Sequence, residues 1–169
     1  MGNSIRLDGN NPEEAFSMSN GGTDAFLNVL LISGSPLAKT ISQKRLLVWL
    51  AEKDQIVTRG NSGFDIIDMP WDPDTFGEDK AFLITVINAA LERKNWELLD
   101  YSPDSKIIDS YLEQFKSLVT AVTPQIINKA ALHDWLSDKD NDDPVNCGFP
   151  KCRKHGVLLS FFGCQVCNG

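Results

Sequence analysis

AFLNVLLISG, residues 25–34, contains the longest apolar stretch of the sequence and decides how the rest of the chain is interpreted. Only Asn28 interrupts its apolar part, and Gly34 ends it. A short, nearly continuous apolar run bounded by glycine is typical of a strand that is buried on both faces of a sheet. A membrane span would need about 20 apolar residues. We therefore expect a buried central strand at this position.

Four start signals for helices follow along the chain. Two are pairs of residues in the spacing of a capping box, and two place proline at the first helical position after a hydroxyl residue. These signals are Thr40 with Gln43, Thr75 with Glu78, Ser102-Pro103, and Thr123-Pro124. The first three precede apolar residues that recur every three or four positions. The fourth predicts a shorter helix that ends near Trp135.

The remaining strand signals lie in QIVTRGNSGFDIIDMP, residues 55–70, which predicts two short strands around a glycine-containing turn. The predicted fold is α+β or α/β, with a small sheet of about three strands covered by three or four helices and a C-terminal zinc knuckle. The expected parts are a flexible N-terminal arm, a core domain, an acidic linker and a zinc-knuckle tail packed on the core. Their ranges are 1–24, 25–137, 138–146 and 147–169.

Composition indicates a globular protein, with 42% hydrophobic and 23% charged residues. The formal net charge of -7 disfavours binding to nucleic acid and suits docking to a basic partner protein. The first residues contain no apolar segment of the kind found in secretory signals, so we expect a cytoplasmic protein with reduced thiols.

CRKHGVLLSFFGCQVC, residues 152–167, holds three of the four cysteines and one of the two histidines. Cys152 with His155, and Cys164 with Cys167, form two pairs with two intervening residues each. Zinc is commonly held by two such pairs, and four protein ligands leave no open coordination position. The spacing therefore predicts a structural zinc site. Cys147 is an alternative ligand that could replace His155.

The same residues support a resemblance. Their pattern resembles the zinc knuckles of the form Cys-x-x-His-Gly…Gly-Cys-x-x-Cys that occur beside some phage HNH endonuclease domains. The resemblance covers only residues 152–167, and no HNH motif accompanies it. It implies a bound metal and no activity.

No catalytic set is evident in the sequence. His133 lies beside Asp134 in KAALHDWL, and adjacent helical residues point about 100° apart, so they cannot act as a relay. The chain contains none of the usual serine-hydrolase, metalloprotease or phosphate-loop motifs. We therefore predict no catalytic residues.

LLISGSPLAKTISQKRLL, residues 30–47, resembles the first phosphate-binding loop of flavodoxin-like NADPH-dependent FMN reductases. That resemblance implies that Ser33, Ser35 and Thr40 contact a flavin phosphate. The family's Pro-Glu-Tyr-Asn segment is replaced by PQII at residues 124–127, so only a degenerate FMN-binding reductase would be expected.

MPWDPDTF, residues 69–76, places aromatic residues among carboxylates in a proline-containing loop. Such a loop suits an interface with a basic protein, although the aromatic residues could instead pack on the following helix. The predicted partner-binding residues are Trp71, Asp72, Asp74, Phe76, Asp142 and Asp143.

Three functional interpretations follow. The first is a non-catalytic acidic binding protein for a basic partner such as a toxin domain, with a bacterial immunity protein as the leading form. The second is a zinc-containing nucleic-acid adaptor that uses Lys151, Arg153 and Lys154. The third is the degenerate flavin reductase.

Overall fold

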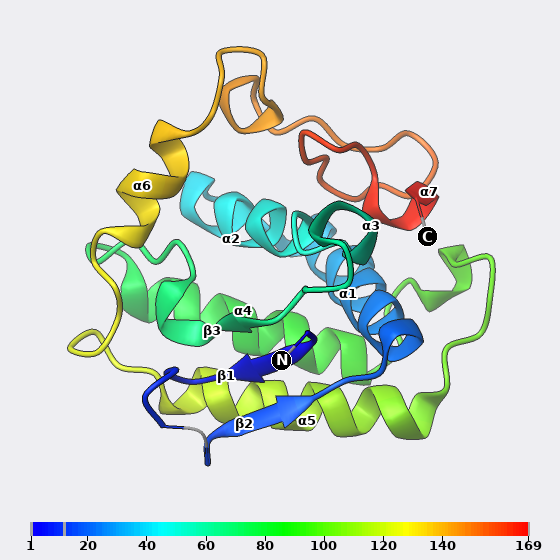
Figure 1. The fold of residues 1–169 in the computed structure, drawn as a ribbon. Helices are drawn as coiled ribbons and strands as arrows, with labels where there is room; N and C mark the ends of the chain where they lie inside the picture. The colour runs from blue at the N-terminus through cyan, green and yellow to red at the C-terminus, as the bar shows by residue number, and fades with distance from the viewer. Residues whose placement is uncertain (1, 12, 169) are drawn as a thin grey trace.

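A helix, α1 (Asn20–Gly34), runs through the centre of the molecule (Figure 1). The computed structural model describes residues 2–11 and 13–168. The side chain of Ser19 caps α1 by accepting a hydrogen bond from the N–H of Gly22 at 3.1 Å. Every residue from position 25 to position 34 is buried. The expectation of a central strand here is therefore wrong.

The physical reason is the burial of α1 on all sides. A helix that is surrounded by other elements needs no polar face, so its sequence shows no 3.6-residue period. A short apolar run of this kind cannot be assigned to strand or helix by periodicity alone.

Three helices pack around α1. They are α2 (Ile41–Ala51), α4 (Phe76–Leu91) and α5 (Ser105–Ala121). On α1, Phe26 is fully buried and meets Phe115 of α5 edge-to-face, with ring centroids 5.4 Å apart. The remaining helical elements are short: η1 (Ser35–Leu37), α3 (Gln55–Thr58), η2 (Ile66–Asp68), η3 (Trp96–Leu98), α6 (Ala131–Ser137), η4 (Pro144–Asn146) and α7 (Gln165–Asn168).

The helix starts agree only in part with their signals. Thr40 and Gln43 form the predicted capping box, with hydrogen bonds of 3.1 and 3.2 Å. Thr75 is the N-cap of α4, but its side chain caps no backbone N–H. Asp104, rather than Ser102, caps α5. The helix α6 begins at residue 131, well after the signal at Thr123-Pro124.

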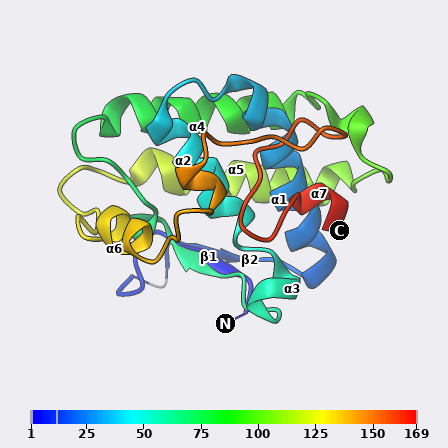
Figure 2. The same cartoon turned by 90° about the horizontal axis from the view of Figure 1, so that it is seen from above.

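The sheet contains β1 (Ser4–Arg6), β2 (Ala15–Ser17) and β3 (Phe64–Asp65), in the order β2-β1-β3. The central strand β1 pairs antiparallel with β2 and parallel with β3. Ile5 lies opposite Phe16 and Phe64 and is fully buried. Figure 2 shows the sheet and α6 on one side of the helices.

This sheet confirms the predicted fold class, a sheet of about three strands covered by helices, but uses other residues. Two of its strands come from the expected flexible arm, residues 1–24. Within residues 55–70 only β3 is a strand, because residues 55–58 form α3. Strands of two or three residues carry almost no periodic signal, so pairing between distant segments decides where they form.

The expected acidic linker, residues 138–146, packs on the end of α2. Lys139 pairs with Glu52, and its ammonium also lies 3.9 Å from a carboxylate oxygen of Asp143. Trp135 donates a hydrogen bond to Glu52 at 2.8 Å, and Val145 is buried. These contacts anchor the acidic segment to the core through Lys139 and Val145.

Asp79 is a buried carboxylate near the start of α4. It accepts hydrogen bonds from Ser42 of α2 and from Thr75, the latter at 2.8 Å. Burial raises the pKa of Asp79, whereas the two hydroxyl donors lower it and the net shift is upward. The side chain joins α4 to α2 and adds a negative charge where the α4 dipole favours one.

None of the helices among the described residues combines the length and the apolar composition that a membrane crossing requires.

Candidate metal centre

Two turns present the Cys and His side chains. In the first, Gly156 donates a hydrogen bond to the carbonyl of Cys152 at 2.8 Å, and Cys152 donates one to Val157 at 2.8 Å. Gly156 has a φ of 70°, in the left-handed region that glycine tolerates. The second turn leads into α7, where the N–H of Cys167 points at the sulfur of Cys164 from 3.4 Å.

A strand-like ladder connects the two turns and fixes them on the helices. Lys151 and Leu158 form an isolated antiparallel bridge. Val157 and Leu158 are both fully buried. The N–H of Leu158 donates a hydrogen bond to the hydroxyl of Ser35 at 3.1 Å, at the end of α1. The turns are therefore held against the centre of the fold.

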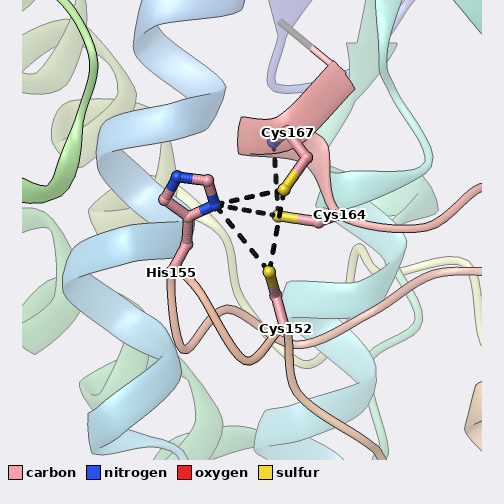
Figure 3. Close-up of side chains that lie close together, drawn as sticks. All are labelled: Cys152, His155, Cys164 and Cys167. Atoms are coloured by element: carbon pink, nitrogen blue, oxygen red, sulfur yellow. Dashed lines mark hydrogen bonds between the residues drawn. The ribbon is translucent and has the colours of Figure 1, made fainter.

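The four side chains converge on one point (Figure 3). The ligand atoms of Cys152, His155, Cys164 and Cys167 all lie within 4.8 Å of one another. The sulfurs of Cys152 and Cys167 are 3.7 Å apart. Nδ1 of His155 lies 3.8, 3.6 and 3.3 Å from the sulfurs of Cys152, Cys164 and Cys167.

These separations match a metal-centred tetrahedron. Zinc bonds of about 2.3 Å to sulfur and about 2.0 Å to nitrogen give edges of about 3.8 Å between sulfurs and about 3.6 Å between nitrogen and sulfur. The four side chains therefore lie together in an arrangement that is consistent with a metal site.

The thiols differ in acidity. Of the effects on the pKa of Cys152, burial is the largest and raises it. Hydrogen bonds from the backbone of His155 and Lys154 lower it, and the resulting pKa is about 6. Burial raises the pKa of the Cys164 thiol to about 12. The lowered pKa of Cys152 favours its thiolate, the form that binds a metal, whereas binding of a metal by Cys164 would displace its thiol proton to solvent.

His155 presents Nδ1 to the sulfurs and is buried, with an exposed fraction of 4%. Its Nε2 is also buried and has no hydrogen-bond partner among the described residues. Metal-bound histidines usually donate from their second nitrogen to an oxygen.

Cys147, the alternative ligand, does not join the cluster. Its side chain is exposed, and its sulfur lies 3.4 Å from the carbonyl oxygen of Asn141. The structure brings His155 rather than Cys147 to the three other cysteines.

The predicted partner-binding residues are not all available at the surface. Trp71 is fully buried and donates a hydrogen bond to the carbonyl of Ile66 at 2.8 Å. Phe76 is buried against it, with ring centroids 4.9 Å apart. Asp143 is buried and caps η4. The prediction is therefore wrong for these three residues, because each completes the core or a helix end.

The other three predicted partner-binding residues reach solvent. Asp74 and Asp142 are exposed, and Asp72 is half-buried. Asp72 accepts a hydrogen bond from the N–H of Asp74 at 2.9 Å, which fixes the shape of their loop.

The expected flavin-phosphate loop does not exist. Helix α1 continues directly into η1, so no strand ends at Gly34. Ser33 donates its hydroxyl hydrogen to the carbonyl of Lys94 at 2.9 Å, Ser35 bonds to Leu158, and Thr40 caps α2. All three hydroxyls are engaged inside the protein, so this prediction is wrong.

Sequence reasoning also missed an exposed aromatic pair. Phe161 and Phe162 occupy the turn between Ser160 and Gly163, with exposed fractions of 58% and 45%. Their rings meet edge-to-face at 5.4 Å between centroids. The residue in the sequence that could have indicated this turn is Gly163, which adopts a φ of 91° and ends the ladder. His133, by contrast, is exposed on α6 beside Asp134.

Comparisons with protein-family models, with curated proteins and with solved structures found no match to this chain.

Proposed function

We propose that Cys152, His155, Cys164 and Cys167 bind one zinc ion that has a structural role. The observation that carries this proposal is the convergence of four ligand atoms within 4.8 Å of one another, with four of their separations between 3.3 and 3.8 Å. Three thiolates with one imidazole are a donor set that zinc accepts readily. Four protein ligands fill the tetrahedron, so the ion is left no position for a substrate.

Metal analysis tests the zinc proposal. Native mass spectrometry of the purified chain should show one zinc per molecule, displaced by a strong chelator. His155→Ala should lower the zinc content several-fold at micromolar concentration, because it removes one ligand. Cys147→Ala is the matched control and should keep one zinc. Full zinc content in His155→Ala, or loss in Cys147→Ala, would overturn the assignment.

We further propose that the protein acts by binding and docks through acidic residues to a basic partner protein. The term acidic side is used here for Asp68, Asp72, Asp74, Asp134 and Asp138. Hydrogen bonds from Asn128 to the carbonyl of Ile67 and to Asp68 tie the loop before α4 to the chain that enters α6. Figures 1 and 2 show this loop and α6 on the same side of the molecule.

Charge supports this docking proposal, because clustered carboxylates attract a basic surface and accelerate association. Inhibition of a basic toxin domain, as an immunity protein performs it, is the form of this function that we would test first. Affinity capture of the tagged protein from its native cells, followed by mass spectrometry, should recover one basic protein in equimolar amount.

The double variant Asp72→Lys with Asp74→Lys should lose that protein. The charge reversal Glu113→Lys is the control, because Glu113 is exposed and lies on α5. This variant should retain the captured protein. Equal recovery by both variants would reject the acidic side as the docking surface.

A further inference from the structure

Charge is distributed very unevenly along the chain. Residues 36–51 and 147–168 contain none of the 23 acidic residues of the protein. They hold six of its 16 lysines and arginines: Lys39, Lys44, Arg45, Lys151, Arg153 and Lys154. The rest of the chain therefore has ten cationic residues against 23 acidic ones. A protein with a net charge of -7 thus contains two segments that are purely basic.

The fold places these two segments side by side. Leu158 is hydrogen-bonded to Ser35, directly before the first segment. The ammonium of Lys44 lies 5.9 Å from the ring centroid of Phe149. Figure 2 shows the C-terminal segment lying across α1 and close to α2. We call the surface formed by residues 36–45 and 147–163 the basic face.

The cations of the basic face are largely unneutralised. Among the described residues, only Lys154 of the six has a carboxylate within ion-pair distance, that of Asp100 at 3.6 Å. Lys39, Lys151 and Arg153 are exposed, and Lys44 is half-buried. Charges that meet no partner within the protein are free to meet phosphates in solution.

The basic face also carries the exposed aromatic pair. Leu159 donates a hydrogen bond to Pro150 at 2.9 Å, and the turn with Phe161 and Phe162 follows at once. The two rings therefore extend from the same ladder that carries Lys151. Their edge-to-face packing keeps each ring oriented while both stay accessible.

We propose that the basic face binds single-stranded nucleic acid, with bases stacked on Phe161 and Phe162 and phosphates bound by Lys44, Lys151 and Arg153. Aromatic rings beside a cationic track are the arrangement that holds unpaired bases without sequence preference. A duplex offers no free base face to these rings, so single strands should be preferred. The fixed ladder and the short turn favour stacking over deep insertion into a lipid layer.

The proposal goes beyond the docking function of the acidic side and uses a different surface. It rests on the zinc proposal only for the shape of the knuckle, which the metal content of each variant reports separately. Electrostatic repulsion by the rest of the chain should make binding weak at physiological salt and strongly dependent on ionic strength.

Fluorescence anisotropy of a labelled 20-nucleotide oligothymidylate, titrated with the zinc-loaded chain at low salt, tests the proposal. The unmodified chain should bind it, and an unlabelled duplex of equal length should compete poorly. Phe161→Ala with Phe162→Ala should weaken binding by roughly tenfold or more, because stacking contributes about 5-fold to 150-fold per base. Lys151→Glu should weaken binding and reduce its dependence on salt.

Lys106→Glu is the matched control, since Lys106 is an exposed cation on α5 outside the basic face. It should leave binding within about twofold, because a distant surface charge acts only through the screened field. All variants should keep one zinc per chain.

Two results would overturn the proposal. One is the absence of oligonucleotide binding at low salt by the zinc-loaded chain. The other is equal binding by the double phenylalanine variant. Vesicles containing one quarter phosphatidylserine serve as the lipid probe, and binding to them without binding to the oligonucleotide would reassign the basic face to membrane recognition.

Discussion

The central helix α1 is buried and the knuckle lies partly at the surface, and the sequence describes the two regions very differently. The four knuckle residues could be chosen from their spacing, and the structure brings all four together. The apolar run of α1 was assigned to the wrong type of element. The knuckle is specified by neighbouring residues two positions apart, whereas the state of α1 depends on what surrounds it on every side.

The same contrast applies to the forces that hold the two regions. Burial stabilises α1 through many small contacts, so the helix tolerates the loss of any one of them at a limited cost. One ion would hold the knuckle, so the loss of a single ligand should affect all of it. The following predictions test that difference.

Removal of the metal should have the largest effect and should remain local. Structural zinc contributes about 10–16 kcal/mol of apparent binding energy in small zinc-dependent folds. A chelator, or Cys164→Ser, should therefore make the amides of residues 152–167 exchange rapidly in a hydrogen-exchange experiment. The amides of α1 that lie against α4 and α5 should stay protected. Full protection of the knuckle in Cys164→Ser would contradict the role given to the metal.

Phe26→Ala should cost about 3–5 kcal/mol of unfolding free energy, because it leaves a cavity between α1 and α5. Urea denaturation in excess zinc measures this cost. Phe161→Ala is the control, since its ring is exposed and its removal should change stability by less than about 0.5 kcal/mol. Zinc content should stay at one per chain in both variants. A cost for Phe26→Ala below that of the control would show that α1 is not the centre of the core.

Thr40→Ala should cost about 1 kcal/mol, because it removes the side chain that caps α2. Ser102→Ala tests the cap that the sequence suggested for α5 but the structure gives to Asp104. That variant should be nearly neutral in the same urea measurement. A larger cost for Ser102→Ala than for Thr40→Ala would contradict both the cap assigned to Thr40 and the absence of a capping role for Ser102.

Asp79 should give the core a pH dependence of definite sign. Its pKa is raised in the folded protein by burial, so the folded chain holds the proton more tightly than the unfolded chain. The stability from this protonation is present at low pH and is lost as the pH rises from about 4 through the raised pKa. Asp79→Asn should flatten the change in urea midpoint between pH 4 and pH 7. An unchanged pH profile would show that the Asp79 carboxylate is not buried as described.

The features that could be predicted are those encoded over a few residues. The capping box at Thr40 and the ligand pairs of the knuckle belong to this class. The fold class could also be predicted, because the pattern of apolar residues indicates which segments are helices that pack together. Pairing of Ile5 with Phe64 could not be predicted, since the two residues lie far apart in the chain and their strands are only two or three residues long. The burial of Trp71 could not be predicted either, because its loop contains several polar residues whereas its ring packs into the core.

The hydrogen bond between Leu158 and Ser35 joins residues 123 positions apart. Translation proceeds at about 5–20 residues per second, so roughly 6–25 seconds pass between the synthesis of these two residues. During that interval the end of α1 emerges from the ribosome without the segment that will cover it. The end of α1 therefore receives its last covering segment only when synthesis of the chain is nearly complete.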